Sequence, residues 1–352
     1  MTRVFRLVLL AVVLLSACGS PENPAPKLSA PPTRTPIAAE VATRAPAANQ
    51  IEVISLRGKV ADFLATADTV PALEQTITFM EMVSGAGCLG SMQESDLQFQ
   101  ALFAVAGIRW PIADFTAWRQ AVEAFPEAEL IQQVTAQLQK VKDALPLAAP
   151  LRVCLIPVPE PPAPGESGQI GRSFMYVVAL NDLNTLALAG DLMLVTCSAG
   201  GGCLDDVPVE LTRGYSYTYQ QHQTGMRLET MTLLDRMVFE GRANDFTLRL
   251  FPEAAFPWTD ALTSEDEAKA WRRLRRALDS DEYRYDFMYD LLYGYYGDPN
   301  YPVWGGVYVG DQIVQAYRAQ NPELSWTQLA AIPPEQLFTE SGYDPSAAAY
   351  TP

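Results

Sequence analysis

The chain offers few side chains that could act as nucleophiles or as metal ligands. Its 352 residues include one histidine, His222, and five cysteines. Ser216 carries a hydroxyl that could attack a carbonyl group, but no G-x-S-x-G turn surrounds it and no histidine faces it to take its proton. His222 lies near the end of a predicted helix, where an exposed or capping role is the ordinary interpretation. We therefore expect neither serine catalysis nor a histidine-rich metal site.

The cysteines favour disulfide chemistry over metal binding. Cys197 and Cys203 flank Ser-Ala-Gly-Gly-Gly, a flexible turn that could close a small loop, and we expect a disulfide between them. A bond between Cys88 and Cys154 stays open. Zinc between Cys197 and Cys203 would need two further ligands, which a chain with one histidine hardly supplies.

The fifth cysteine, Cys18, ends a short export signal. Residues 1–17 carry two arginines near their start, Arg3 and Arg6, and continue from Leu7 as an apolar run that is too short to span a bilayer of about 30 Å as a helix. The end of this run, Leu15-Ser16-Ala17-Cys18, resembles the lipobox of bacterial lipoproteins. The resemblance implies cleavage before Cys18 and lipid on its thiol. It also implies a place in the cell envelope, on the outer side of the cytoplasmic membrane or in an outer membrane.

Composition separates a tether from a folded body. Residues 19–50 contain seven prolines, eight alanines and no aromatic residue, so we expect residues 18–50 to form a disordered, semi-stiff spacer. Without the signal, the chain has 23 basic and 41 acidic residues. Such a surface repels nucleic acid and anionic lipid headgroups, and neither is expected as a partner.

The hydrophobic pattern predicts an α+β fold that is mostly helical. Residues 51–150 are predicted to form a helical bundle, because apolar residues recur every three or four positions. The helices are expected at 57–66, 71–83, 94–106, 112–125 and 130–145. Three short β-type runs follow at 151–158, 173–179 and 190–197. Further helices are expected at 205–223, 227–246, 265–278, 283–295 and 307–320.

Three blocks on the later helices resemble a bacterial family of predicted zinc-dependent proteases within the zincin class. They are Val207–Gln221, Thr232–Phe246 and Gly305–Tyr317, the last followed by Ser341-Gly342-Tyr343. They stand where the family has its H-E-x-x-H helix, its E-G-x-A segment and its G-Y-x-x-G helix. The resemblance implies that residues 151–352 form a zincin-like core, with a small sheet and a central helix, behind the helical part.

The chain departs from this family at the residues that would perform the chemistry. In H-E-x-x-H the two histidines bind zinc and the glutamate polarises water. Here Arg213 stands at the first ligand, Gly214 at the glutamate and Tyr217 at the second ligand. A guanidinium has no lone pair for a metal, and His222 lies on the opposite side of the helix from Arg213. Zinc, expected for the family, is therefore not expected here.

Glu240 is the group that remains, since it matches the third metal ligand of the family. Glu240 continues an apolar stripe on its helix, so its carboxylate is expected to point inward. Burying a carboxylate without a partner costs free energy. Two arrangements are open. Either Arg213 takes the place of the zinc ion and pairs with Glu240, or Glu240 is solvated and Arg213 lies on the surface.

Two functions follow as expectations. The first is an anchored binding module for a peptide or protein, with no catalytic residue and no metal; the second is a peptidase with an unorthodox site. An aromatic run between Tyr283 and Tyr308, ten residues in all, is open to two interpretations. It could be a stacking platform for a ligand, or it could be ordinary helix packing.

Overall fold

The computed structural model describes residues 51–72, 74–86, 88, 112–148, 151–158, 177–179, 191–198, 203–226, 230–256, 258–259, 262–279, 290–294 and 301–345. All of them belong to one compact unit, Thr43–Pro352. The signal, the tether, the helix expected at 94–106 and most of the one expected at 283–295 lie outside these residues. The described part is mostly helical with a small sheet, which confirms the predicted α+β class.

The sheet has four strands among the described residues, in the order β1-β2-β4-β3. β1 (Ile51–Ser55), β2 (Leu151–Val158) and β4 (Asp191–Ser198) are parallel, and β3 (Val177–Ala179) runs antiparallel to β4. The prediction of a helical pattern from residue 51 was wrong for β1. This strand is too short to show a clear period, and its partner begins a hundred positions later, with Ile51 opposite Leu151.

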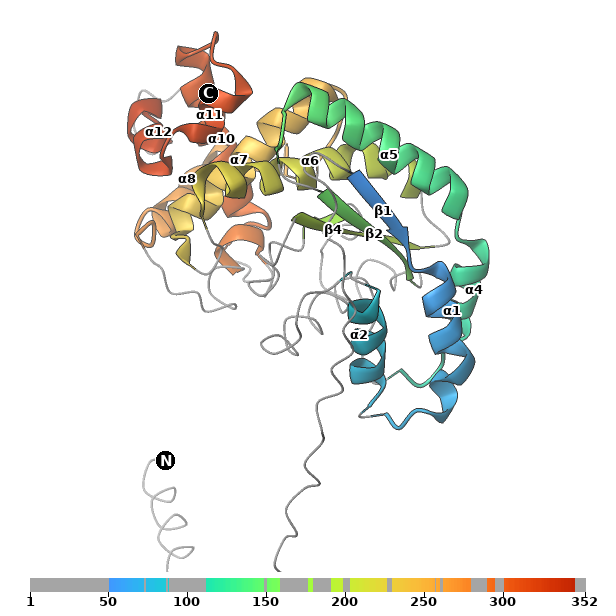
Figure 1. The fold of residues 1–352 in the computed structure, drawn as a ribbon. Helices are drawn as coiled ribbons and strands as arrows, with labels where there is room; N and C mark the ends of the chain where they lie inside the picture. Colours follow the sequence, from blue (N-terminus) through green and yellow to red (C-terminus); the bar gives the residue numbers. More distant parts are fainter. Residues whose placement is uncertain are drawn as a thin grey trace, which may run out of the picture. The chain divides into compact units, whose positions relative to one another are not determined.

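Alternate residues of β2 point into two different apolar cores, one on each face of the sheet. Leu151, Val153 and Leu155 pack with α5 (Glu127–Ala144) and α6 (Cys203–Thr224). The opposite face contacts α1, α2 and α4, whose bounds are Arg57–Thr66, Gln75–Gly85 and Thr116–Ala124. Figure 1 shows α5 along one face of the sheet and α1 on the other side. The early helices therefore cover a sheet, and the prediction of a helical bundle was wrong in this respect.

The two helices that carry the family motifs start and stop for local reasons. α6 ends where Gly225 takes a left-handed conformation (φ +65), as expected for a helix stop. The next helix, α7 (Leu233–Leu250), begins at a capping box in which Thr232 and Asp235 satisfy each other's backbone N–H groups. Its start is six residues later than expected from the sequence, where the pattern predicted residue 227.

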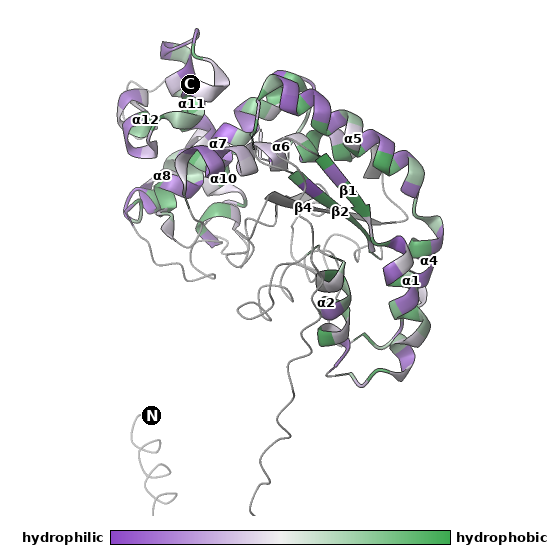
Figure 2. Ribbon diagram, in the orientation of Figure 1, coloured by the Kyte–Doolittle hydropathy of each residue, from purple (hydrophilic) through white to green (hydrophobic). Residues whose placement is uncertain are grey.

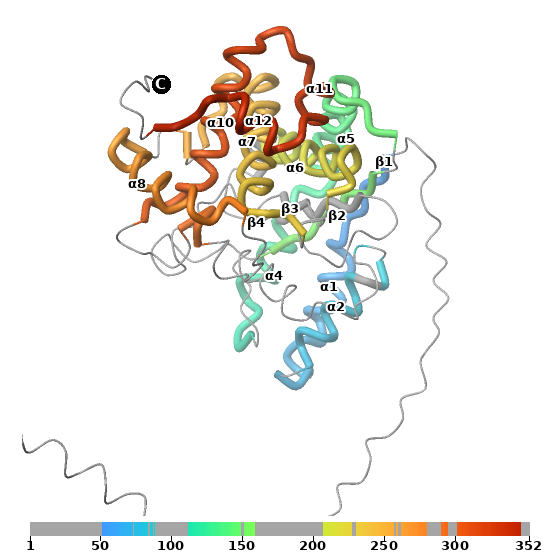
Figure 3. Tube along the Cα trace, turned by 90° about the vertical axis from the view of Figure 1, so that its left-hand side faces the viewer, coloured from blue at the N-terminus to red at the C-terminus, as the bar shows by residue number. Residues whose placement is uncertain are grey.

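The C-terminal helices build a third core around α7. They are α8 (Ser264–Leu274), α10 (Gly305–Gln320), α11 (Trp326–Ala331) and α12 (Pro334–Ser341). Figure 2 shows apolar and hydrophilic positions on different sides of α8 and α12, as surface helices require, whereas most residues of α10 are buried. In Figure 3, α6 lies between α5 and α7. None of the described helices is long and apolar enough to cross a membrane.

One disulfide joins the described residues, between Cys88, just after α2, and Cys154 of β2. It settles the pairing that the sequence left open. Both cysteines are buried in the core on the α1 side of the sheet. The side chains of Cys197 and Cys203 lie outside the described part, so their disulfide stays a prediction.

Candidate functional site

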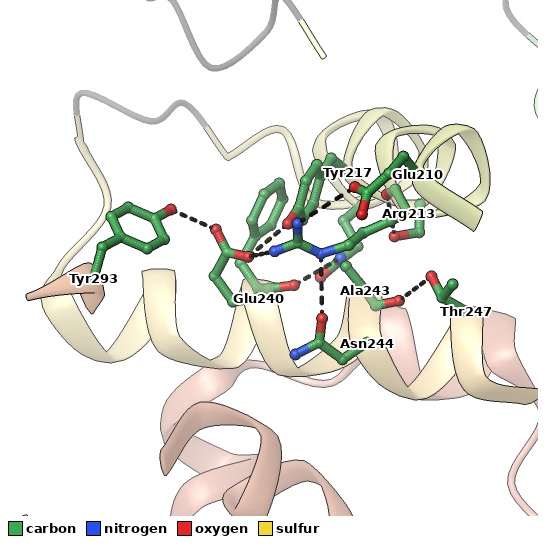
Figure 4. Close-up of polar contacts among 11 residues, drawn as sticks. Glu210, Arg213, Tyr217, Glu240, Ala243, Asn244, Thr247 and Tyr293 are labelled. Carbon is green, nitrogen blue, oxygen red and sulfur yellow. Dashed lines mark hydrogen bonds and ion pairs between the residues drawn. The ribbon is translucent and has the colours of Figure 1, made fainter. Parts of the chain in front are cut away.

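Two helices bring the motif residues together. Arg213 and Tyr217 lie one turn apart on α6 and face α7, from which Glu240 points back toward them (Figure 4). Residues four apart lie on the same side of a helix, so both side chains reach the same carboxylate. The three residues that the sequence resemblance singled out thus do converge in the structure.

Arg213 pairs directly with Glu240. Its Nη2 lies 2.5 Å from Glu240 Oε2, and its Nε donates to Asn244 Oδ1 at 3.2 Å. Its Nη1 lies 3.9 Å from Oε2 of Glu210, one turn earlier on α6. The relative exposure of Arg213 is 3% and that of Glu240 is 1%. Of the two arrangements left open by the sequence, the structure has the ion pair.

Both oxygens of the Glu240 carboxylate accept hydrogen bonds. The hydroxyl of Tyr217 donates to Oε2 at 2.5 Å, and the hydroxyl of Tyr293 donates to Oε1 at 2.8 Å. A buried charge is tolerated when it is paired and its remaining lone pairs are satisfied. The three partners Arg213, Tyr217 and Tyr293 meet this requirement from two segments of the chain, α6 and the segment that carries Tyr293.

Aromatic rings close the site around the guanidinium. The Arg213 guanidinium carbon lies 4.5 Å from the Trp258 ring centroid and 5.2 Å from that of Tyr217. Trp304 packs against both Trp258 and Tyr293, with centroids 5.1 and 5.6 Å apart. Trp258, Tyr293 and Trp304 are all buried. These described members of the aromatic clusters are packing groups and do not form an exposed stacking platform.

The backbone at Trp304 is in the left-handed region, with φ 64, which is uncommon for a residue with a side chain. It immediately precedes α10, and its N–H donates to the carbonyl of Tyr293. Strain of this kind persists where the surrounding structure fixes it. Here the left-handed backbone places the Trp304 indole against Trp258 and Tyr293. The hydrogen bond from Trp304 also connects the start of α10 to the segment that carries Tyr293.

The charge on Arg213 is fixed. Burial by itself lowers the pKa of a guanidinium, but Tyr217, Glu240 and Glu210 face it and raise the pKa of Arg213 above its usual value. The net effect is a group that stays protonated at every physiological pH. Arg213 therefore acts as a permanent buried cation beside Glu240.

The residues present do not fit a zinc ion. Within the described ranges, no three residues of the types His, Cys, Asp and Glu come together to hold a metal. The guanidinium fills the space next to Glu240, and the Tyr217 hydroxyl donates its hydrogen to the same carboxylate. Gly214 supplies no side chain beside Arg213. The arrangement is a charged, hydrogen-bonded cross-link between α6, α7 and the segment of Tyr293.

Two further candidates from the sequence lie away from any reactive arrangement. The Ser216 hydroxyl donates to the backbone carbonyl of Arg213 at 2.8 Å and is buried. His222 is exposed near the end of α6. The exposed position of His222 near the helix end agrees with the ordinary role expected for it.

Sequence reasoning missed four contributors to the site. Glu210 lies three residues before Arg213, and Asn244 lies four residues after Glu240. Both contact the Arg213 guanidinium, so helix spacing could have identified them. Tyr293 and Trp258 come from distant segments, and only the tertiary fold brings them in. The run of aromatic residues was visible in the sequence, but nothing in it distinguished Tyr293 from its neighbours.

Comparison with known proteins gives one match. A family model described as predicted Zn-dependent protease (DUF2268) covers residues 175–339, a segment that contains α6, α7 and α10. No curated protein and no solved structure matches the chain. Over residues 175–339, a little under half of the chain, the sequence is therefore similar to the family of predicted Zn-dependent proteases.

Proposed function

We propose that this protein is a catalytically inactive member of its protease family, held at a membrane by lipid on Cys18 and acting outside the cytoplasm as a binding module. The single observation that carries the proposal is the buried ion pair between Arg213 and Glu240. Peptide hydrolysis in this family depends on a metal at that place. A side chain that is itself a cation occupies it here.

The surrounding residues support loss of hydrolysis in a second way. A water molecule attacking a peptide bond needs a group that takes its proton, and the corresponding position is Gly214. The Glu240 carboxylate accepts hydrogen bonds from Arg213, Tyr217 and Tyr293, so both of its oxygens are already engaged by side chains of the protein. The same contacts make the site rigid, which suits a scaffold that presents a surface to a partner.

The proposed partner is a peptide or a protein. The excess of acidic side chains disfavours nucleic acid, because its phosphates are repelled. The expected cellular place is the envelope, with the spacer at 18–50 separating the folded body from the lipid. These parts of the proposal rest on the sequence signals at the start of the chain.

Metal analysis and a cleavage assay test the proposal together. The full chain purified in detergent is measured for bound zinc by mass spectrometry and for casein digestion with and without added zinc. We expect neither stoichiometric zinc nor cleavage. Stoichiometric zinc or chelator-sensitive digestion would establish the alternative, a peptidase with an unorthodox site.

A restored variant provides the positive control. The triple substitution Arg213→His, Gly214→Glu and Tyr217→His rebuilds H-E-x-x-H opposite Glu240, which supplies the third ligand. We expect this variant to bind zinc where the natural chain does not. The partial variant Gly214→Glu keeps the arginine and should not gain zinc, so it shows whether the added carboxylate alone attracts metal.

A further inference from the structure

A dense group of basic residues lies on α8 and the turn that follows it, in a chain whose formal net charge is −16. Five of its 25 basic residues fall between positions 269 and 276, in the sequence Lys-Ala-Trp-Arg-Arg-Leu-Arg-Arg. The proposed function does not use this group. Its members are Lys269, Arg272, Arg273, Arg275 and Arg276.

Three of the arginines point into solvent from one face. Arg275 keeps a right-handed helical conformation after the end of α8, so the helical path continues past Leu274. At about 100° per residue, Arg272, Arg275 and Arg276 fall within an arc of roughly 100°. All three are exposed, and their side chains make no ion pair or hydrogen bond in the part of the chain that the structure describes. We call these three residues the arginine face.

The opposite side of this helix is fixed to the body. Trp271 and Leu274 are buried, and the Trp271 indole donates to Asp344 at 3.1 Å. Arg273 pairs with Asp290 at 3.3 Å and covers the Tyr301 ring at 4.9 Å. These contacts hold the arginine face in place, so a partner does not have to order the backbone of α8 on binding. Figure 2 shows this amphipathic division along α8.

Helix stability explains only part of this arrangement. Basic residues near a helix end interact favourably with the carbonyl groups there, typically by less than about 1 kcal/mol each at exposed positions. That effect needs one or two charges, and the last turn of α8 already contains Arg272 and Arg273. Arg275 and Arg276 add two more charges, and the three members of the arginine face repel one another. A guanidinium is also suited to bidentate bonds with carboxylates.

We propose that the arginine face binds an acidic segment of a partner protein. The charge of the face complements closely spaced carboxylates, and its extent matches a short peptide. An extended anionic surface is disfavoured, because it would bring many charges within a Debye length, about 8 Å, of the acidic side chains outside the arginine face and be repelled by them. This inference does not depend on whether the centre at Arg213 cleaves peptide bonds.

A binding assay with a defined probe tests the proposal. The full chain in detergent is titrated into fluorescein-labelled polyglutamate peptide, and anisotropy is recorded at low and high salt. We expect binding that weakens with salt and that falls at least about tenfold in Arg275→Glu/Arg276→Glu, since two attractive charges become repulsive.

The matched control is Lys59→Glu/Lys140→Glu, which changes the net charge by the same amount at two exposed positions away from α8. We expect this variant to lose much less affinity. An equal loss in both variants would show a general charge effect and overturn the proposal, as would absent binding by the natural chain. Binding of phosphatidylglycerol vesicles through the arginine face, without binding of the peptide, would assign the surface to lipid and overturn it too.

Discussion

The buried charge of Glu240 restricts which residues can lie next to it. A carboxylate with 1% relative exposure has lost almost all of its hydration, so a cation must compensate for its charge. Here a single side chain, Arg213, supplies the compensating charge and its own hydrogen bonds, and Tyr217 donates a further hydrogen bond to the same carboxylate. The residues at these two positions are therefore linked by one electrostatic requirement.

This link predicts the effect of removing the arginine. Arg213→Met keeps much of the apolar volume but leaves the Glu240 charge buried without its cation, so we expect a loss of about 3–5 kcal/mol in the free energy of unfolding. Urea denaturation followed by circular dichroism measures it. The double variant Arg213→Met/Glu240→Gln removes both charges and should recover a large part of the loss.

The matched control is Arg249→Met, which removes an arginine of α7 whose side chain is 45% exposed and pairs with Asp245 at 3.6 Å. Exposed ion pairs contribute about 0–1 kcal/mol, so this change should be small. If Arg213→Met costs no more than Arg249→Met, the buried pair does not stabilise the fold in the way described.

Asp311 on α10 predicts a dependence of stability on pH. Burial, together with the nearby Asp245, raises the pKa of Asp311 to about 7, although Gln315 donates to its Oδ2. Its Oδ1 is buried without a hydrogen-bond partner. Between about pH 4 and pH 7 the folded state keeps a proton that the unfolded state has lost, so this group makes stability fall as pH rises through that window.

Asp311→Asn should remove this contribution. We expect the variant to match the natural chain near pH 4 and to exceed it by up to about 4 kcal/mol near pH 8, since one pKa unit corresponds to about 1.4 kcal/mol. Urea denaturation across this pH range measures the difference. The exposed Asp62→Asn serves as control and should leave the pH profile unchanged. A constant difference between Asp311→Asn and the natural chain at all pH values would contradict the prediction.

At the scale of elements, two glycines allow α7 and α10 to approach each other. A Cβ on Gly241 would collide with the Gly310 carbonyl, and a Cβ on Gly310 would collide with the Met237 carbonyl. Both obstacles are backbone atoms, which cannot rotate away. The glycines of the two family blocks therefore have a packing role, because they bring the helix of Glu240 against α10.

Gly310→Ala should consequently separate these helices, at a cost of about 2–3 kcal/mol in the free energy of unfolding. Thermal and urea unfolding measure it. The control is Gly58→Ala in α1, where a Cβ would meet nothing within 4 Å. Alanine is the better helix former, so this control should gain about 0.5–1 kcal/mol. A neutral Gly310→Ala would mean that the two helices can move apart without loss.

The Cys88–Cys154 disulfide joins residues 66 apart in sequence and ties the end of α2 to the central strand β2. Loop-closure entropy predicts that Cys88→Ala/Cys154→Ala lowers stability by about 4 kcal/mol. Unfolding with and without reductant measures it. The double variant should still respond to reductant if Cys197 and Cys203 are bonded as predicted, and thiol titration of this variant counts the cysteines that remain free.

Periodicity was enough to predict most elements but not how they associate. Leu151–Val158 is a strand with the expected bounds, and Arg57–Thr66 is a helix with the expected bounds. β1 was missed because five half-buried residues show too little pattern, and its parallel partner lies far along the chain. The ion pair at Arg213 could be proposed from helix spacing and charge, whereas Tyr293 and Trp258 depend on long-range packing that no local pattern records.

At the scale of the whole molecule, we propose that the first fifty residues determine where the folded body works. If the spacer at 18–50 is a coil it reaches on the order of 30 Å, and if it is polyproline-like it reaches up to about 100 Å. If Cys18 is lipidated as proposed, either length separates the folded body from the lipid surface. This geometry requires that the cysteine at the end of the signal is the attachment point.

Metabolic labelling with palmitate tests that attachment in bacterial cells that make lipoproteins. We expect label on the natural chain and none on Cys18→Ser, because the serine has no thiol to receive the lipid. Cys197→Ser is the matched control, since it removes another cysteine and should stay labelled. Label that persists in Cys18→Ser would place the lipid elsewhere, and an unlabelled natural chain would mean that residues 1–17 act as an ordinary export signal. In that case the spacer would have no anchor to extend from, and the binding module would act free of the membrane.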